Sequence, residues 1–123
     1  SLSFNPISDI GPLSSLTGLT ELYLNGNQIS DIKPISTLAG LVELRLDRNQ
    51  MSDISLLSAF TNLSYLRLDY NLITDISPLV DNVGMDKGDY VEIVENKLEC
   101  DQEDLDDIAA LLARGVDLLH DCY

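Results

Sequence analysis

The residues that could perform covalent or metal chemistry are few, apart from 21 acidic side chains. A nucleophilic cysteine needs a base held against it, and His120, the only histidine, lies two positions before Cys122. Neighbours in one short strand are poorly placed for proton transfer, so we expect a surface histidine and no enzyme activity. Without a Cys-x-x-Cys pair, a His-Glu-x-x-His motif or a glycine-rich phosphate loop, we expect no metal and no cofactor.

The two cysteines, Cys100 and Cys122, both lie near the C-terminal end of the sequence. A disulfide between them would tie this end shut and would contribute roughly 3 kcal/mol on the chain-entropy model. It would also indicate a secreted or cell-surface protein. Two free thiols in an intracellular protein are the alternative.

The elements that carry these residues repeat along the chain with a period of 22 positions. Such a fixed period is the signature of a repeat array, in which each unit buries its apolar edge against the next. The columns that keep this period are Leu2, Leu24, Leu46 and Leu68; Asn5, Asn27, Asn49 and Asn71; Asp9, Asp31, Asp53 and Asp75; and Ile10, Ile32, Ile54 and Ile76.

Each unit contains a short strand followed by a turn. Around Leu22 and Leu24 apolar and polar residues alternate, which predicts a strand with both leucines facing inward. Asn27 falls where that strand ends, and an inward asparagine there can satisfy buried backbone groups of the turn. We therefore predict a structural asparagine ladder rather than a ligand site. Its members are Asn5, Asn27, Asn49, Asn71 and Asn96.

The aspartate of each unit precedes an Ile-x-Pro segment, as in Asp31-Ile32-Lys33-Pro34. Aspartate caps helical turns through its side-chain oxygen, and proline is tolerated in the first turn. A calcium column would need a denser cluster of oxygen ligands. Capping of a 3₁₀-like turn is therefore the favoured interpretation.

The unit Leu-x-x-Leu-x-Leu-x-x-Asn-x-Ile-x-Asp-Ile-x-Pro-Ile/Leu-x-x-Leu, seen at 19–38 and again at 63–79, resembles the leucine-rich-repeat family, specifically the 22-residue bacterial internalin-like class. The resemblance implies an α/β solenoid with a concave parallel β-sheet and convex 3₁₀-like turns. Residues 1–84 would be the repeats, the first one partial. Because the sequence starts inside a strand pattern, we expect part of a longer array whose uncapped N-terminal end can self-associate.

Residues 85–123 are predicted to hold the last strand and a C-terminal cap. Three extra residues enter around positions 80–88, after which a strand pattern returns near Val91. A capping helix at about 102–114 would pack through Leu105, Ile108, Ala109 and Leu112, and a short strand would follow near 116–120. This region resembles the C-terminal caps of bacterial extracellular repeat proteins.

Tyrosine and arginine, the residue types that dominate binding hot spots, concentrate on the outward positions of the predicted strands. We therefore predict that the concave face binds a protein or a glycan, and that alanine at Tyr65 and Arg67 would weaken binding without unfolding the array. A charge ladder that only keeps the sheet soluble is the alternative. The predicted binding residues are Tyr23, Glu43, Arg45, Tyr65, Arg67, Asp69, Tyr70, Tyr90 and Glu92.

The net charge of −14 makes nucleic acid and anionic membrane surfaces poor partners, and no apolar run is long enough to cross a bilayer. The function that the sequence favours is a non-catalytic binding module of a bacterial secreted or surface protein. A structural spacer and an intracellular docking or regulatory subunit remain alternatives.

Overall fold

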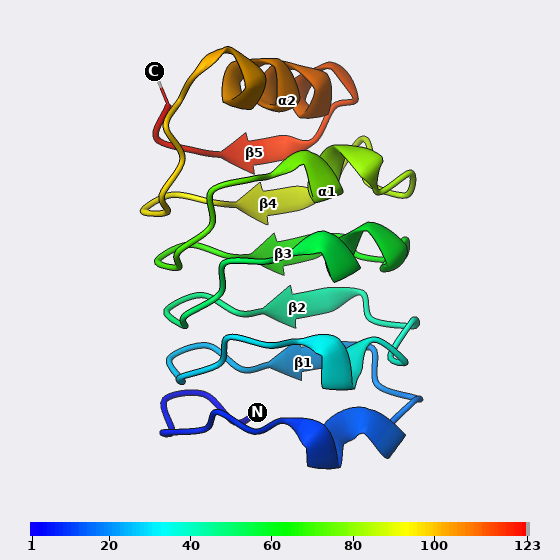
Figure 1. Ribbon diagram of the computed structural model, residues 1–123. Helices are drawn as coiled ribbons and strands as arrows, with labels where there is room; N and C mark the ends of the chain where they lie inside the picture. The colour runs from blue at the N-terminus through cyan, green and yellow to red at the C-terminus, as the bar shows by residue number, and fades with distance from the viewer. Residues whose placement is uncertain (123) are drawn as a thin grey trace.

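The computed structural model describes residues 1–122 as a solenoid whose strands follow one another in chain order (Figure 1). Five strands form one parallel sheet in the order β1 to β5. Their bounds are β1 Glu21–Tyr23, β2 Glu43–Arg45, β3 Tyr65–Arg67, β4 Tyr90–Glu92 and β5 Asp117–Leu119. The fold is thus the expected α/β leucine-rich-repeat solenoid with a concave parallel sheet.

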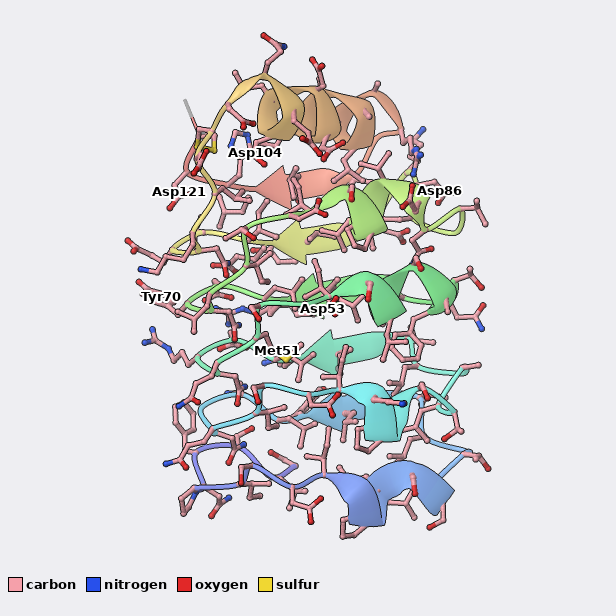
Figure 2. The ribbon with its side chains drawn as sticks, viewed as in Figure 1. Met51, Asp53, Tyr70, Asp86, Asp104 and Asp121 are labelled. Atoms are coloured by element: carbon pink, nitrogen blue, oxygen red, sulfur yellow. A yellow bond between two sulfur atoms is a disulfide. The ribbon has the colours of Figure 1, made fainter. Side chains whose placement is uncertain are left out.

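The convex side carries short helical turns, and each begins just after an aspartate. Three are 3₁₀ helices: η1 Gly11–Ser15, η2 Lys33–Ile35 and η3 Ser55–Ala59. The carboxylate Oδ1 of Asp31 accepts a hydrogen bond of 2.9 Å from Lys33 N, and Asp53, labelled in Figure 2, accepts one from Ser55 N. The prediction that these aspartates bond the start of the turn is confirmed, but the N-cap position itself is taken by the following isoleucine, Ile32 or Ile54, which makes no side-chain cap.

The fourth convex turn differs from the sequence prediction. It is a short α-helix, α1 Ser77–Asp81, rather than a 3₁₀ turn. The three extra residues after it let Asn82 N reach back four positions to Pro78 O at 3.1 Å. The buried Asn82 side chain also donates to Leu57 O and Phe60 O in the preceding repeat, so the insertion is held against its neighbour.

The core is a ladder of apolar side chains between the sheet and the turns. In-register inward residues from successive strands, such as Leu22, Leu44 and Leu66, are buried. Since every repeat places the same column inside, each turn of the solenoid covers the apolar layer of the one before it.

Four of the asparagines predicted to form a ladder lie in the turns that follow β1 to β4. Asn49 Nδ2 donates to Leu24 O at 2.9 Å and to Leu46 O at 3.0 Å, while its Oδ1 accepts from Ile29 N at 3.0 Å. Asn27, Asn71 and Asn96 make the corresponding bonds one repeat before or after. Asn5, by contrast, is exposed and bonds only within its own turn through its side chain.

The helix α2 Gln102–Ala113 covers the C-terminal end of the sheet beside β5 (Figure 1). Asp101 is its N-cap and accepts a hydrogen bond from Asp104 N. Ile108 and Leu111 are buried, whereas Ala109 and Leu112 face solvent. The prediction of the inward face was therefore wrong at Ala109 and Leu112, because the helix is rotated so that Leu111 meets the core.

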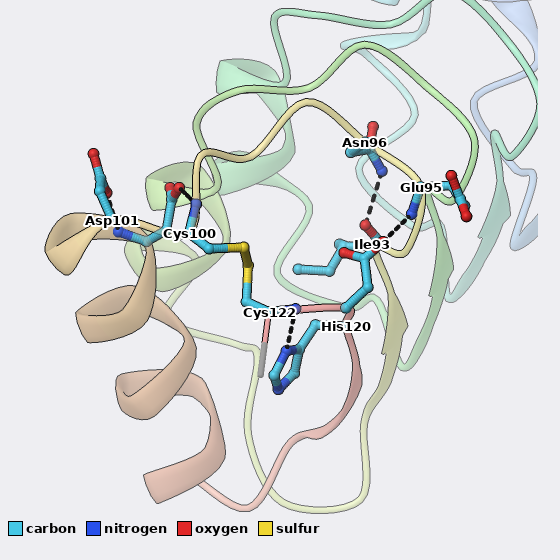
Figure 3. The surroundings of a disulfide bond; sticks show 9 residues. Ile93, Glu95, Asn96, Cys100, Asp101, His120 and Cys122 are labelled. Carbon is cyan, nitrogen blue, oxygen red and sulfur yellow. Dashed lines mark hydrogen bonds between the residues drawn. A yellow bond between two sulfur atoms is a disulfide. The ribbon is translucent and has the colours of Figure 1, made fainter.

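A disulfide between Cys100 and Cys122 joins the start of α2 to the segment after β5, with the Cα atoms 5.5 Å apart (Figure 3). His120 lies beside it, half-buried, and its Nδ1 accepts a hydrogen bond of 3.2 Å from Cys122 N. A cysteine oxidised in this way has no thiolate to act as a nucleophile. No helix among residues 1–122 is both long and apolar enough to cross a membrane.

Candidate binding surface on the concave sheet

We define the concave surface by the outward side chains of the five strands, which alternate with the buried ones. The register places Tyr23 beside Arg45 and Arg45 beside Arg67, and it places Tyr65 beside Tyr90. The residues of this surface are Glu21, Tyr23, Glu43, Arg45, Tyr65, Arg67, Tyr90, Glu92, Asp117 and Leu119.

One part of the concave surface is a stack of planar side chains, formed by Tyr23, Arg45, Tyr65 and Tyr90. The guanidinium of Arg45 lies 4.6 Å from the ring centre of Tyr23 and 5.2 Å from that of Tyr65. Glu43 holds the same guanidinium, with its Oε1 2.9 Å from Nε and 2.8 Å from Nη2. These contacts hold Arg45 in one orientation.

The stack continues through Tyr65 and Tyr90, whose rings are inclined by 18° with centres 5.0 Å apart. The Tyr90 hydroxyl donates a hydrogen bond of 3.0 Å to Glu92 Oε2. Burial and the neighbouring Glu92 raise the pKa of Tyr90 to about 12, so the phenol stays protonated and remains a donor at neutral pH.

The other part of the concave surface is an ion-pair network centred on Arg67, which lies between Arg45 and Glu92 in the sheet. Its guanidinium donates to both carboxylate oxygens of Asp69, at 3.1 and 2.9 Å. Glu92 Oε2 lies 3.2 Å from Arg67 Nε, and Asp47 Oδ1 lies 4.0 Å from the same nitrogen. The side chain of Asp69 is only 1% exposed, so it acts beneath Arg67 rather than at the open surface.

Arg48 and Tyr70 lie at the edge of the concave surface, in the turns after β2 and β3. Both residues adopt the left-handed backbone region, with φ of 58°. The Arg48 guanidinium lies 4.3 Å from the ring centre of Tyr70, which Figure 2 shows on the side of the molecule where the strands end. Tyr70 therefore belongs to a separate pair at this edge rather than to the central stack.

Sequence reasoning placed most of the predicted binding residues on one surface but missed how they pair. It did not identify Asp47 and Asp69 as buried anions, because alternation along a strand predicts only which side a residue takes. The sandwich of Arg45 between two tyrosines could have been found, because all three positions follow from the 22-residue register.

An acidic group outside the concave surface was also not predicted. Carboxylate oxygens of Asp75, Glu103 and Asp107 lie within 4.8 Å of one another and could hold a cation. Burial and the nearby carboxylates raise the pKa of Asp107. Asp75 already uses Oδ1 to accept a hydrogen bond from Ser77 N, so capping explains at least one of the three.

An apolar hollow lies beside the first residues of the chain. It is lined mainly by Leu2, Leu13, Leu16, Leu19 and Leu22. The backbone of the first residues still pairs with the sheet, since Leu2 N donates to Tyr23 O and Phe4 N donates to Asn25 O.

Comparisons with known proteins agree with this architecture. A sequence profile described as leucine-rich repeats in two copies matches residues 1–37 and 40–81. A comparison with curated protein sequences gives no match.

Solved structures of bacterial proteins share the fold. Internalin C2 from Listeria monocytogenes is 30% identical with a TM-score of 0.78, over 94% of this chain and 48% of that protein. Internalin InlF from the same species is 27% identical with a TM-score of 0.65, over 96% of this chain and 39% of that one. A Leptospira interrogans leucine-rich-repeat protein, 22% identical with a TM-score of 0.71 over 94% of this chain and 28% of that one, shares the fold.

The chain thus spans less than half the length of each of these solved structures. Proteins of this repeat family generally mediate protein–protein interaction and are typically not catalysts. The profile match and the repeat geometry together assign the chain to the leucine-rich-repeat family, with similarity to the internalins of Listeria.

Proposed function

We propose that this chain is a non-catalytic binding module that grips a protein partner on its concave surface. The observation that carries the proposal is the continuous stack of Tyr23, Arg45, Tyr65 and Tyr90 on one open sheet. Planar side chains that are already held in place lose little conformational freedom on binding. Tyrosine and arginine in such an arrangement are typical binding anchors.

A protein partner fits this surface better than a glycan. A sugar ring packs on the open face of an aromatic side chain, but here the Tyr65 ring stacks on Tyr90 and Arg45 covers Tyr23 and Tyr65. Apart from the outer ring faces of Tyr23 and Tyr90, what the stack offers to a partner is ring edges, hydroxyl groups and ion pairs, which suit the mixed polar and apolar surface of a protein.

We also propose that the parent protein is secreted or exposed on a bacterial surface. The disulfide between Cys100 and Cys122 supports this, because such bonds persist in oxidising compartments. The similarity to internalins supports it as well. An intracellular docking or regulatory subunit would be expected to keep both cysteines reduced.

The second candidate is a structural spacer. It is favoured by the network around Arg67, in which the guanidinium is already bound by Asp69 and Glu92. In this case the concave polar groups would serve solubility and stability alone, and replacing them would change no interaction.

A selection from a library of displayed random-sequence peptides of fixed length tests the two candidates. Selected peptides are expected to lose at least about tenfold in affinity for the variants Tyr23→Ala and Tyr65→Ala. The convex variant Lys33→Ala is the control and should bind as the original chain does. Peptides whose binding ignores both tyrosines, or no selected peptide at all, would contradict a concave binding surface and favour the spacer.

Self-association of the isolated chain through the apolar N-terminal hollow is a separate proposal. Apolar side chains left open to water favour association with another apolar surface, and the first 20 residues hold one charged side chain, Asp9. Light scattering at high protein concentration should give a mass above that of one chain. A mass equal to one chain across the concentration range would rule the proposal out.

A further inference from the structure

Three carboxylates share a single guanidinium in the middle of the concave surface. Arg67 donates two hydrogen bonds to Asp69, lies 3.2 Å from Glu92 and reaches only 4.0 Å from Asp47. Within this cluster three negative charges face one positive charge. The cluster therefore carries an excess of negative charge that Arg67 does not neutralise.

The excess is concentrated at Asp47. Its side chain is 5% exposed, and its Oδ1, the oxygen directed at Arg67, has no hydrogen-bond donor among residues 1–122. Burial raises the pKa of Asp47 above its usual range, with Arg67 opposing that rise. A buried carboxylate oxygen without a hydrogen-bond donor costs free energy, so a cation placed nearby would be favoured.

The other arginines nearby leave that excess in place, since Arg48 at the edge of the surface lowers the pKa of Asp47 less than burial raises it. Arg45 is bound by Glu43 and held between two tyrosine rings. The concave surface with Asp47 and Asp69 beneath it contains six carboxylates and two guanidiniums, a formal charge of −4. A partner whose charge is complementary to this negatively charged surface must carry positive charge.

We infer that the concave surface receives a basic segment of its protein partner, with a lysine or arginine side chain seated beside Glu92 over the cluster of Asp47, Arg67 and Asp69. This inference rests on the proposed function and names the chemistry of the partner. The incoming cation pairs with Glu92 and lowers the electrostatic cost of the Asp47 carboxylate beneath. The stacked tyrosines provide apolar contact on the adjacent part of the same surface.

The test uses the same displayed random-sequence peptides, with their sequences as the first readout. Peptides that depend on Tyr23 and Tyr65 are expected to be enriched in lysine and arginine relative to the unselected library. Their affinity, measured by titration calorimetry, should fall roughly tenfold for Asp47→Asn and for Glu92→Gln. Asparagine is tolerated in the Asp47 column, because Asn25 occupies that position one repeat earlier.

The matched control is Asp106→Asn, which removes one negative charge on the exposed side of α2 and should change affinity less than about twofold. Two results would overturn the inference while leaving the proposed function intact. One is a set of Tyr65-dependent peptides with neutral or acidic sequences. The other is an equal loss of affinity for Asp106→Asn and Asp47→Asn, which would mean attraction to overall charge alone. If Asp47→Asn unfolds the chain, Glu92→Gln alone decides between these outcomes.

Discussion

The Arg67 guanidinium makes a two-pronged hydrogen bond with the carboxylate of Asp69, at 3.1 Å from Nε to Oδ1 and 2.9 Å from Nη2 to Oδ2. Removing one partner of a buried pair leaves the other charge uncompensated. Since Asp69 is 1% exposed, the pair contributes to the stability of the array as well as to the character of its surface.

Arg67→Ala is therefore expected to lower the free energy of unfolding by about 3–5 kcal/mol. This changes the expectation that alanine at Arg67 would spare the fold, and it makes Tyr23 and Tyr65 the better positions for binding tests. Urea unfolding of the variant measures the effect. Arg48→Ala is the control, since the exposed Arg48 side chain has a ring contact with Tyr70 and only a small electrostatic effect on Asp47, and its loss should cost less than about 1 kcal/mol. Equal losses for both variants would argue against a special role for the Asp69 pair.

Asn71→Ala should also destabilise the array strongly. It removes the donor to Leu46 O and Leu68 O and the acceptor for Met51 N, all of which are buried groups. At about 1–3 kcal/mol for each unpaired group, the expected loss exceeds about 3 kcal/mol. Thermal or denaturant unfolding provides the measurement. Asn5→Ala is the control, because Asn5 is exposed, and it should lower the free energy of unfolding by less than about 1 kcal/mol. A loss as large as that of Asn71→Ala would contradict the proposal that the buried asparagines stabilise the repeats through these hydrogen bonds.

The disulfide is expected to stabilise the cap in particular. Replacing Cys100 and Cys122 by serine should lower stability by about 3 kcal/mol, with the largest rise in amide hydrogen exchange in α2 and β5. Exchange that rises evenly over all repeats would mean that the cap is not a local unit. Thiol titration of the denatured, unreduced protein should find no reactive thiol, and two thiols would refute the bond itself.

Stability should change with pH through Asp107. Burial first, and then Asp75, Glu103, Asp104 and Asp81, raise its pKa above the usual value of 3.8. Between pH 3.8 and the raised pKa of Asp107 in the folded chain, the folded chain binds more protons than the unfolded one. The free energy of unfolding therefore falls as pH rises through this window. Asp107→Asn should therefore be more stable than the original chain at neutral pH and should show a weaker decline across this window. An unchanged slope in denaturant unfolding at several pH values would contradict this assignment.

The sequence predicted the repeats and the asparagine positions because a fixed period forces equivalent residues into equivalent environments. Leu22, Leu44 and Leu66 had to lie in one column once the 22-residue spacing was recognised. The aspartate caps followed from local hydrogen-bonding preferences that do not depend on the rest of the fold.

Features outside the period were harder to predict. The rotation of α2 could not be found from spacing, because Leu111 and Leu112 both fit a helical stripe and only the packing against β5 distinguishes them. Asn82 occupies the buried column of Leu38 and Phe60, where the period predicts an apolar side chain, so its hydrogen bonds to the preceding repeat could not be found from the pattern. The burial of Asp69 depends on where the Arg67 side chain lies, which a pattern of alternation does not specify.

A chemical-shift map of the backbone amides on binding of a selected peptide would locate the binding surface. The largest changes are expected on β1 to β4, around Tyr23, Arg45, Tyr65 and Tyr90, with little change in η1 to η3. Changes confined to the convex turns or to α2 would show that partners do not bind to the concave sheet.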